Sequence, residues 1–252
     1  MSSPSSFRRT VVILTLTLCA TPLYAQPPLT APQNLGIKYM RDGEEYAALA
    51  RQVYRMAGEA VARTAAAAGR QGWAVVLDID ETALDNSTYQ LERAAYSLPF
   101  DAASWSAWIA RREAGAVPGV ADFIALVRRA GGHVAWITNR DKTADDDTRA
   151  NLKSLKILGD DDRLCGQKSP AHTKAMRRAE VVSGKGDCSW NGIAMRVAVF
   201  VGDQMGDFPE ATEHIPGTGT DDAFGRACFL LPNSMYGGWI TRVTRVRPPL
   251  AP

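Results

Sequence analysis

The sequence predicts an α/β protein in which helices cover a doubly wound, mostly parallel sheet. Three short segments, residues 74–77, 133–137 and 196–201, have the nearly continuous apolar pattern of strands buried on both faces of such a sheet. Helical patterns separate these segments along the chain, which is the order that parallel sheets require. Polar or acidic residues follow each segment directly, so candidate functional groups are predicted at the carboxyl edge of the sheet, where α/β proteins bind ligands.

Residues 1–25 have the pattern of a cleaved signal peptide. Arg8 and Arg9 supply its positive start, and the apolar stretch at residues 11–20 is too short to span a bilayer. We therefore expect a periplasmic or secreted protein with no stable membrane insertion. A single membrane anchor is the alternative, whereas lipid attachment at Cys19 is disfavoured by the bulky residue before it.

Charge and length restrict the class of protein. The chain has 29 basic and 27 acidic side chains, and without the two arginines of the signal peptide the balance becomes 27 to 27. A neutral chain lacks the basic surface with which proteins bind nucleic acid polymers, so we expect a small-molecule partner. Residues 43–252 are long enough for one α/β domain, and a homo-oligomer is compatible with this composition. The preceding arm, residues 26–42, begins with a Pro-rich linker or extended stretch at residues 26–34.

The remaining regular elements are predicted from the spacing of apolar residues. In residues 44–68 apolar side chains recur every three or four positions, which is typical of a helix that packs on a sheet. Residues 118–130 form a second amphipathic helix, which glycines end, and residues 145–158 form a third. A further short strand is expected at residues 229–231.

Asp78 and Asp80 follow the first predicted strand and are separated by one residue. A buried strand gains no stability from ending in two carboxylates, and carboxylates this close repel each other unless a cation lies between them. We therefore predict a metal-assisted site in which one aspartate attacks and the other transfers a proton.

An insertion rich in aromatic residues follows this strand at residues 86–116. The pattern is helical, and the aromatic side chains are expected to form a small core. Because the insertion begins directly after the candidate catalytic strand, it is also placed to form a cap that supplies an aromatic wall to the pocket.

The two other strands end in groups that fit the same site. Thr138 and Asn139 follow the second strand, and hydroxyl and amide groups at a strand tip can bind an anion, although helix capping is their commoner use. Asp203 and Asp207 follow the third strand. Four carboxylates at strand ends exceed what structure alone explains.

Cysteine usage is compatible with export. Cys165, Cys188 and Cys228 lie in the predicted domain, an odd number in a compartment that permits disulfides. We predict one bridge, with Cys165–Cys188 as the preferred pair, and one free thiol. The chain has no Cys-x-x-Cys motif and its three histidines are far apart, so a zinc site is not predicted.

These motifs together resemble a known family. The order Asp-x-Asp-x-Thr, a strand-end Thr, a downstream Lys and Gly-Asp-x-x-x-Asp is similar to the four motifs of the haloacid dehalogenase-like (HAD-like) phosphatases. The longer strings DIDETALDNSTYQ, FVGDQMGDF and LPNSMYGGW resemble the class C acid phosphatases, which include the bacterial lipoprotein e 5′-nucleotidases. The resemblance runs from about Tyr46 to Trp239 and implies a HAD-like sheet with a small helical cap.

The resemblance implies a Mg²⁺-dependent phosphomonoesterase. Asp78 would be the nucleophile that forms an aspartyl-phosphate, and Asp80 would protonate the leaving oxygen and then deprotonate the hydrolytic water. Asp80 must start protonated in this role, so a mildly acidic optimum is expected. Asp78, the main-chain carbonyl of Asp80 and Asp203 would hold the Mg²⁺, with Asp207 completing the metal site.

The phosphoryl oxygens would be bound by Thr138, Asn139 and Lys174. Residues 184–195 make the spacing from Lys174 to Asp203 longer than is usual in the family, so Lys168 remains the alternative lysine.

Substrate identity is left open by the sequence. Tyr89, Tyr236 and Trp239 are candidates to stack on the base of a 5′-nucleotide, and in a broad phosphomonoesterase the same aromatic residues would only line the pocket. A phosphotransferase that passes the phosphate to an alcohol would use the same residues. A catalytically silent binding or storage protein is the other alternative, which the presence of all the motif residues disfavours.

Overall fold

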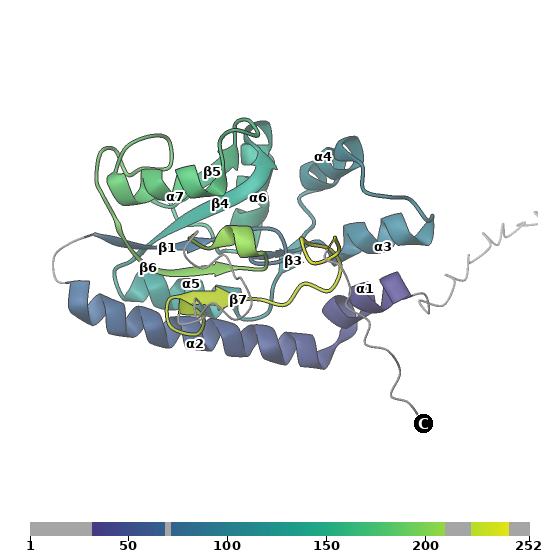
Figure 1. The fold of residues 1–252 in the computed structure, drawn as a ribbon, viewed down its shortest axis with the longest axis horizontal. Coiled ribbons are helices and arrows are strands. Elements are labelled where there is room, and N and C mark those ends of the chain that lie inside the picture. The colour runs from purple at the N-terminus through teal and green to yellow at the C-terminus, as the bar shows by residue number, and fades with distance from the viewer. Residues whose placement is uncertain (1–31, 69–71, 210–222, 242–252) are drawn as a thin grey trace, which may run out of the picture.

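A parallel sheet forms the centre of the molecule (Figure 1), and the structure, a computed structural model, describes residues 32–68, 72–209 and 223–241. Within these residues the sheet has five strands in the order β5-β4-β1-β6-β7, and every neighbouring pair is parallel. The strands are β1 (Trp73–Leu77), β4 (His133–Asp141), β5 (Arg163–Gln167), β6 (Arg196–Gly202) and β7 (Cys228–Leu230). Because β4 and β6 flank β1 on opposite sides, a crevice lies beyond the carboxyl end of β1. The predicted α/β class with a mostly parallel sheet is confirmed.

Helices cover both faces of this sheet: α2 (Glu44–Ala68), α5 (Val120–Arg129), α6 (Asp145–Ser154) and α7 (Lys174–Ser183). In Figure 1, α2 and α5 lie below the sheet and α7 lies above it. Val75 and Leu77 of β1 pack in the cluster on the α2 side, whereas Ala74 and Val76 pack in the cluster that contains Val181 of α7. Every residue of β1 is therefore buried, which explains why its sequence is apolar throughout.

An insertion after β1 carries helices α3 (Ser87–Ala95) and α4 (Ala102–Arg111). Its two ends are joined by a short antiparallel pair, β2 (Leu84–Asp85) and β3 (Gly115–Ala116). Figure 1 shows both helices beside the carboxyl end of the sheet. The insertion predicted at residues 86–116 thus contains these helices and lies at the crevice.

A helix, α1 (Pro32–Asp42), and a strand of the main sheet, β5, are not predicted by the sequence. The linker or extended conformation predicted for residues 32–34 is wrong, because these residues form the first turn of α1. This helix contacts α3. Proline suits the first helical position, where a backbone N–H would lack a partner. The other element is β5, whose sequence RLCGQ has no apolar run by which a strand could be recognised.

The predicted Cys165–Cys188 disulfide is wrong in this structure, because both residues are free cysteines. They are nevertheless neighbours in the apolar cluster between the sheet and α7. The pKa of the Cys188 thiol is raised, first by a hydrogen bond with Cys165 and then by burial. Thiols in such surroundings pack as small hydrophobic groups. Cys228 is likewise buried, at the start of β7.

Two predictions fall on residues that the structure does not describe: the signal peptide at residues 1–25 and the first part of the arm at residues 26–31. Among the residues that it does describe, no helix is both long and apolar enough to cross a membrane.

Candidate active site

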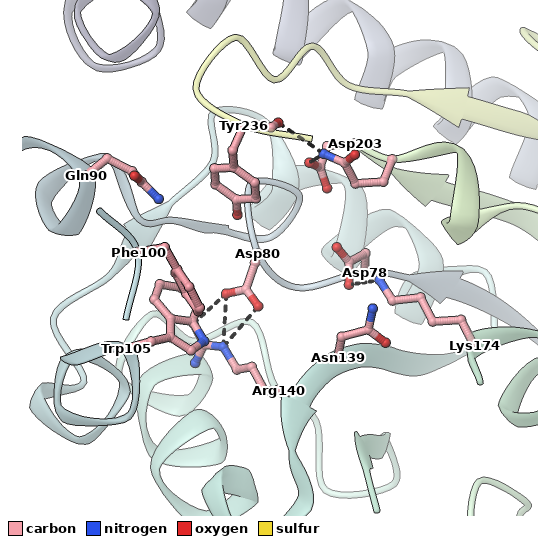
Figure 2. Close-up of a pocket in the computed structure, with 11 residues that line it drawn as sticks. Asp78, Asp80, Gln90, Phe100, Trp105, Asn139, Arg140, Lys174, Asp203 and Tyr236 are labelled. Carbon is pink, nitrogen blue, oxygen red and sulfur yellow. Dashed lines mark hydrogen bonds and ion pairs between the residues drawn. The ribbon is translucent and has the colours of Figure 1, made fainter. Parts of the chain in front are cut away.

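The segment after β1 sends its two aspartates in different directions. The backbone N–H of Asp78 still bonds to the carbonyl of Val201 on β6, at 3.0 Å, so Asp78 is fixed by the sheet. Figure 2 shows its carboxylate beside Lys174, whereas the carboxylate of Asp80 faces Arg140. Glu81 then adopts a left-handed backbone conformation (φ 56°), which turns the chain directly after the two aspartates. The predicted strand-end pair therefore lies in the crevice.

Lys174 is the lysine at this site. It is the first residue of α7, whose N-terminus is capped by Thr173, and its Nζ lies 2.5 Å from an oxygen of both Asp78 and Asp207. Burial alone would lower the pKa of Lys174, but these two carboxylates more than offset it, so the net shift is upward and the lysine is charged. The alternative, Lys168, is instead half exposed and pairs with Asp187.

Asp78, Asp203 and Asp207 form a buried acidic cluster. One carboxylate oxygen from each lies within 4.8 Å of the others, and Asp203 is held by Thr82, Gln204 and Asn233. Burial, followed by the Asp207 carboxylate, raises the pKa of Asp203 to about 6. Burial also raises the pKa of Asp78 well above its ordinary range, and Lys174 offsets this only in part.

The unbalanced charge of this cluster fits a divalent cation. One lysine faces two of the three carboxylates, so their repulsion is not neutralised by the side chains that contact them. An all-oxygen set of ligands suits a hard cation such as Mg²⁺. Asp80 was predicted to join through its main-chain carbonyl, and its side chain is directed elsewhere, toward Arg140.

Gly202 permits the close approach of the acidic segment to the end of β6. A Cβ at this position would lie 2.3 Å from the Cβ of Asp207. Asp207 in turn accepts a hydrogen bond from the backbone N–H of Gln204 at 2.8 Å, which fixes its carboxylate toward Lys174. The first glycine of the motif FVGDQMGDF therefore serves packing at the acidic cluster.

Thr138 and Asn139 lie in the carboxyl-terminal half of β4. The buried Thr138 hydroxyl accepts a hydrogen bond from the backbone N–H of Arg140 at 3.0 Å and lies 3.4 Å from Asp80. Asn139 is exposed and lines the pocket, and its Oδ1 accepts a 2.8 Å hydrogen bond from Arg177. Arg177, for which the sequence offers no signal, also donates hydrogen bonds to the carbonyls of Thr138 and Cys165 and so joins α7 to β4 and β5.

A pocket of about 420 Å³ opens in front of these groups. It is lined by Asp78, Asp80, Gln90, Phe100, Trp105, Asn139, Arg140, Lys174, Asp203, Gln204 and Tyr236. Figure 2 shows Phe100, Trp105 and Tyr236 around Asp80. Aromatic side chains thus form one part of the pocket and charged groups form the other.

Of the three aromatic residues predicted to bind substrate, the structure places only Tyr236 in the pocket wall. Tyr89 does not line the pocket: it is buried behind the wall, where its ring contacts Trp105 at 5.0 Å between centroids and its hydroxyl bonds to Ser104. Trp239 is half exposed, donates its indole N–H to the carbonyl of Asn233 and does not line this pocket, so its role in substrate binding stays a prediction. Phe100 and Trp105 take this place, and the aromatic content of the insertion was the only signal for them.

This arrangement can carry out group transfer at an anionic centre. A carboxylate paired with a lysine lies at the crevice floor, a second carboxyl group faces the same pocket, and the acidic cluster can hold a cation beside the first. A buried lysine and a cation would offset the charge of a bound phosphoryl group.

Comparison with known proteins agrees with this geometry. The family model for the HAD superfamily, subfamily IIIB (acid phosphatase), matches residues 26–239. The chain is also similar to the solved structure of the class C acid phosphatase from Bacillus anthracis, with 27% identity and a TM-score of 0.70 over 84% of this chain and 87% of that one. The structure of that enzyme with tungstate bound matches with 26% identity and a TM-score of 0.70, over 82% and 86% of the two chains. The chain therefore belongs to the subfamily IIIB acid phosphatases of the HAD superfamily and is a phosphomonoesterase.

Proposed function

We propose that the protein hydrolyses phosphate monoesters through an aspartyl-phosphate on Asp78, with Mg²⁺ as its cofactor. The contact of 2.5 Å between Lys174 and Asp78, at the floor of the pocket, carries this proposal. A nucleophilic carboxylate must approach an anionic phosphoryl group, and a lysine beside it offsets the repulsion between them.

Two displacements at phosphorus complete the reaction. An oxygen of Asp78 attacks phosphorus, and the bond to the ester oxygen breaks while Asp80 gives its proton to the leaving alcohol. Asp80 then takes a proton from water, whose oxygen bonds to phosphorus as the bond to Asp78 breaks. Lys174 contacts the phosphoryl oxygens in both steps, and Thr138 and Asn139 bind them from the end of β4.

Asp78, Asp203 and Asp207 would hold the Mg²⁺, together with the main-chain carbonyl of Asp80. The cation would polarise the phosphoryl group and offset the charge that builds up on its oxygens. Asp203 is already oriented by Asn233 and Gln204, both at 2.8 Å, so it needs little rearrangement to act as a ligand.

Removal of divalent cations is expected to abolish hydrolysis and to lower the melting temperature at pH 7. The acidic cluster carries more negative charge than Lys174 offsets, and a bound cation stabilises the folded state by its binding free energy. Activity and thermal unfolding should be measured after chelation and again after addition of Mg²⁺ or Ca²⁺. Full activity in chelator, with no shift in melting temperature on adding Mg²⁺, would contradict the metal site.

We further propose that the aromatic part of the pocket binds a flat group of the substrate, such as the base of a 5′-nucleotide. Tyr236 comes from the loop after β7, and Phe100 and Trp105 come from the insertion. Rings on two sides of a pocket can stack on an aromatic ligand, at about 1–3 kcal/mol for each stacked base.

This substrate preference can be tested by comparing 5′-AMP, 3′-AMP, nicotinamide mononucleotide, p-nitrophenyl phosphate and glycerol phosphate. We expect Tyr236→Leu to lower kcat/KM for 5′-AMP by about 5–100-fold, in line with the loss of one stacked base, and to change glycerol phosphate little. Trp239→Leu, outside the pocket wall, serves as the matched control. Equal rates on all five esters, unaffected by Tyr236→Leu, would rule out nucleotide preference.

A further inference from the structure

The two carboxylate oxygens of Asp80 have different surroundings. Oδ1 accepts three hydrogen bonds, from Arg140 Nη2 at 2.7 Å, Arg140 Nε at 2.9 Å and Asn86 Nδ2 at 3.0 Å. Within the part of the chain that the structure describes, Oδ2 has two longer contacts, with Arg140 Nε at 3.3 Å and the Thr138 hydroxyl at 3.4 Å. Three donors occupy the acceptor sites of Oδ1, so Oδ2 is the oxygen left to carry a transferable proton.

The side chain of Asn86 is fixed by the insertion. Its Oδ1 accepts the indole N–H of Trp108 at 2.8 Å, so its Nδ2 must face Asp80. If the amide were reversed, its carbonyl oxygen would meet the carboxylate and the indole N–H would lose its acceptor. Asn86 and Trp108 are both almost fully buried, so water cannot replace these partners at low cost.

Arg140 is fixed as firmly as Asn86. Its side chain is 1% exposed, and its Nη1 donates to the Thr148 hydroxyl of α6 at 3.1 Å. The ring of Trp105 covers the guanidinium at 5.6 Å. Arg140 could turn toward a substrate only by breaking these contacts. We therefore read its guanidinium as a group that orients the carboxylate of Asp80.

We propose that Arg140, Asn86 and Trp108 are positioning residues that hold Asp80 so that Oδ2 exchanges the proton with the leaving group. Trp108 belongs to α4 and does not line the pocket, so it connects the insertion to proton transfer without itself contacting the substrate. This inference rests on the proposed function, because it requires Asp80 to be the general acid.

Leaving-group dependence separates a positioning role from a structural one. The alkoxide of an alkyl phosphate is a poor leaving group unless its oxygen is protonated. The leaving group of 2,4-dinitrophenyl phosphate is a stable phenolate, which needs no proton from an acid. The constant kcat/KM reports only the steps through the first displacement, in which Asp80 acts as the acid. Loss of correct positioning should therefore reduce kcat/KM for glycerol phosphate much more than for the dinitrophenyl ester.

Trp108→Phe removes one N–H and keeps most of the packing. We expect it to lower the ratio of kcat/KM for glycerol phosphate to that for 2,4-dinitrophenyl phosphate by about tenfold or more, and Arg140→Lys to lower it further. The matched control is Trp190→Phe, which removes a buried indole N–H that donates to the carbonyl of Asp161, away from Asp80. This control should leave the ratio unchanged.

The Asp80→Asn variant distinguishes failure of the positioning role from failure of the proposed function, in case the ratio does not change in Trp108→Phe or Arg140→Lys. A large fall of the ratio in Asp80→Asn, with none in Trp108→Phe or Arg140→Lys, would overturn the positioning role and leave the proposed function intact. Equal losses for both esters in Arg140→Lys would also overturn it, because they indicate binding of the phosphoryl group. No fall of the ratio in Asp80→Asn itself would overturn both proposals.

Discussion

Replacing Asp78 with Asn is expected to lower kcat/KM for every phosphate monoester by about 10⁴-fold or more, as loss of a catalytic nucleophile does elsewhere. The amide has the shape of the carboxylate but no charge, so its oxygen is a poor nucleophile. Hydrolysis of p-nitrophenyl phosphate and of an alkyl phosphate should be measured in saturating Mg²⁺.

Stability measurements separate this chemical effect from unfolding. Burial raises the pKa of Asp78 well above its ordinary range, so near neutral pH the ionised carboxylate destabilises the metal-free fold. Asp78→Asn should therefore leave the metal-free melting temperature unchanged or raise it. Asp162→Asn is the matched control: this buried carboxylate accepts hydrogen bonds from Arg128 and Trp136, away from the pocket, and its replacement should not change turnover. Asp78→Asn activity within tenfold of wild type would exclude Asp78 as nucleophile.

Lys174→Met is expected to lower kcat/KM by about 10²–10³-fold, the usual loss when one group that stabilises transition-state charge is removed. It should also destabilise the metal-free protein by about 3–5 kcal/mol near neutral pH, because two buried carboxylates lose their cation. Both carboxylate contacts with Lys174 are 2.5 Å long, and its side chain is only 11% exposed. Lys168→Met, at a half-exposed lysine, should change neither quantity.

The pH dependence of the Lys174→Met defect has a definite sign. In the wild type the pKa of Asp78 is already raised and that of Asp203 is about 6, and loss of the lysine raises the pKa of Asp78 further. Carboxyl groups with a raised pKa are protonated in the folded state at pH 4 and lose their protons only at higher pH, so the defect is small at pH 4 and grows as the pH rises toward 7. The stability defect is measured by thermal unfolding of the metal-free wild type and Lys174→Met variant between pH 4 and pH 7. A defect that is constant with pH, or equal in Lys168→Met, would contradict the pairing.

The acidic part of the site could be predicted because its signals are local. Asp78, Asp80, Asp203 and Asp207 each follow a buried strand, and parallel strands bring their carboxyl ends to one edge. Lys174 needed the resemblance to a family, since a lysine at a helix start has no distinguishing pattern of its own.

The groups around Asp80 could not be predicted, because they depend on side-chain direction after folding. Arg140 follows Thr138 by two residues, but nothing in the sequence indicates that it turns back to Asp80. Tyr89 and Trp105 belong to the same aromatic insertion, and only the packing of α3 against α4 decides that Trp105 faces the pocket. The strand β5 was missed for a similar reason, since its pairing with β4 and not its composition defines it.

The steric course at phosphorus tests the covalent intermediate most directly. Each in-line displacement inverts the configuration, so transfer to Asp78 followed by transfer to water restores it. A phosphate monoester made chiral at phosphorus with sulfur and oxygen isotopes should be hydrolysed in isotopically labelled water, and the configuration of the product determined. Net retention is the expected result. Net inversion would show that water attacks the ester directly, without an aspartyl-phosphate on Asp78.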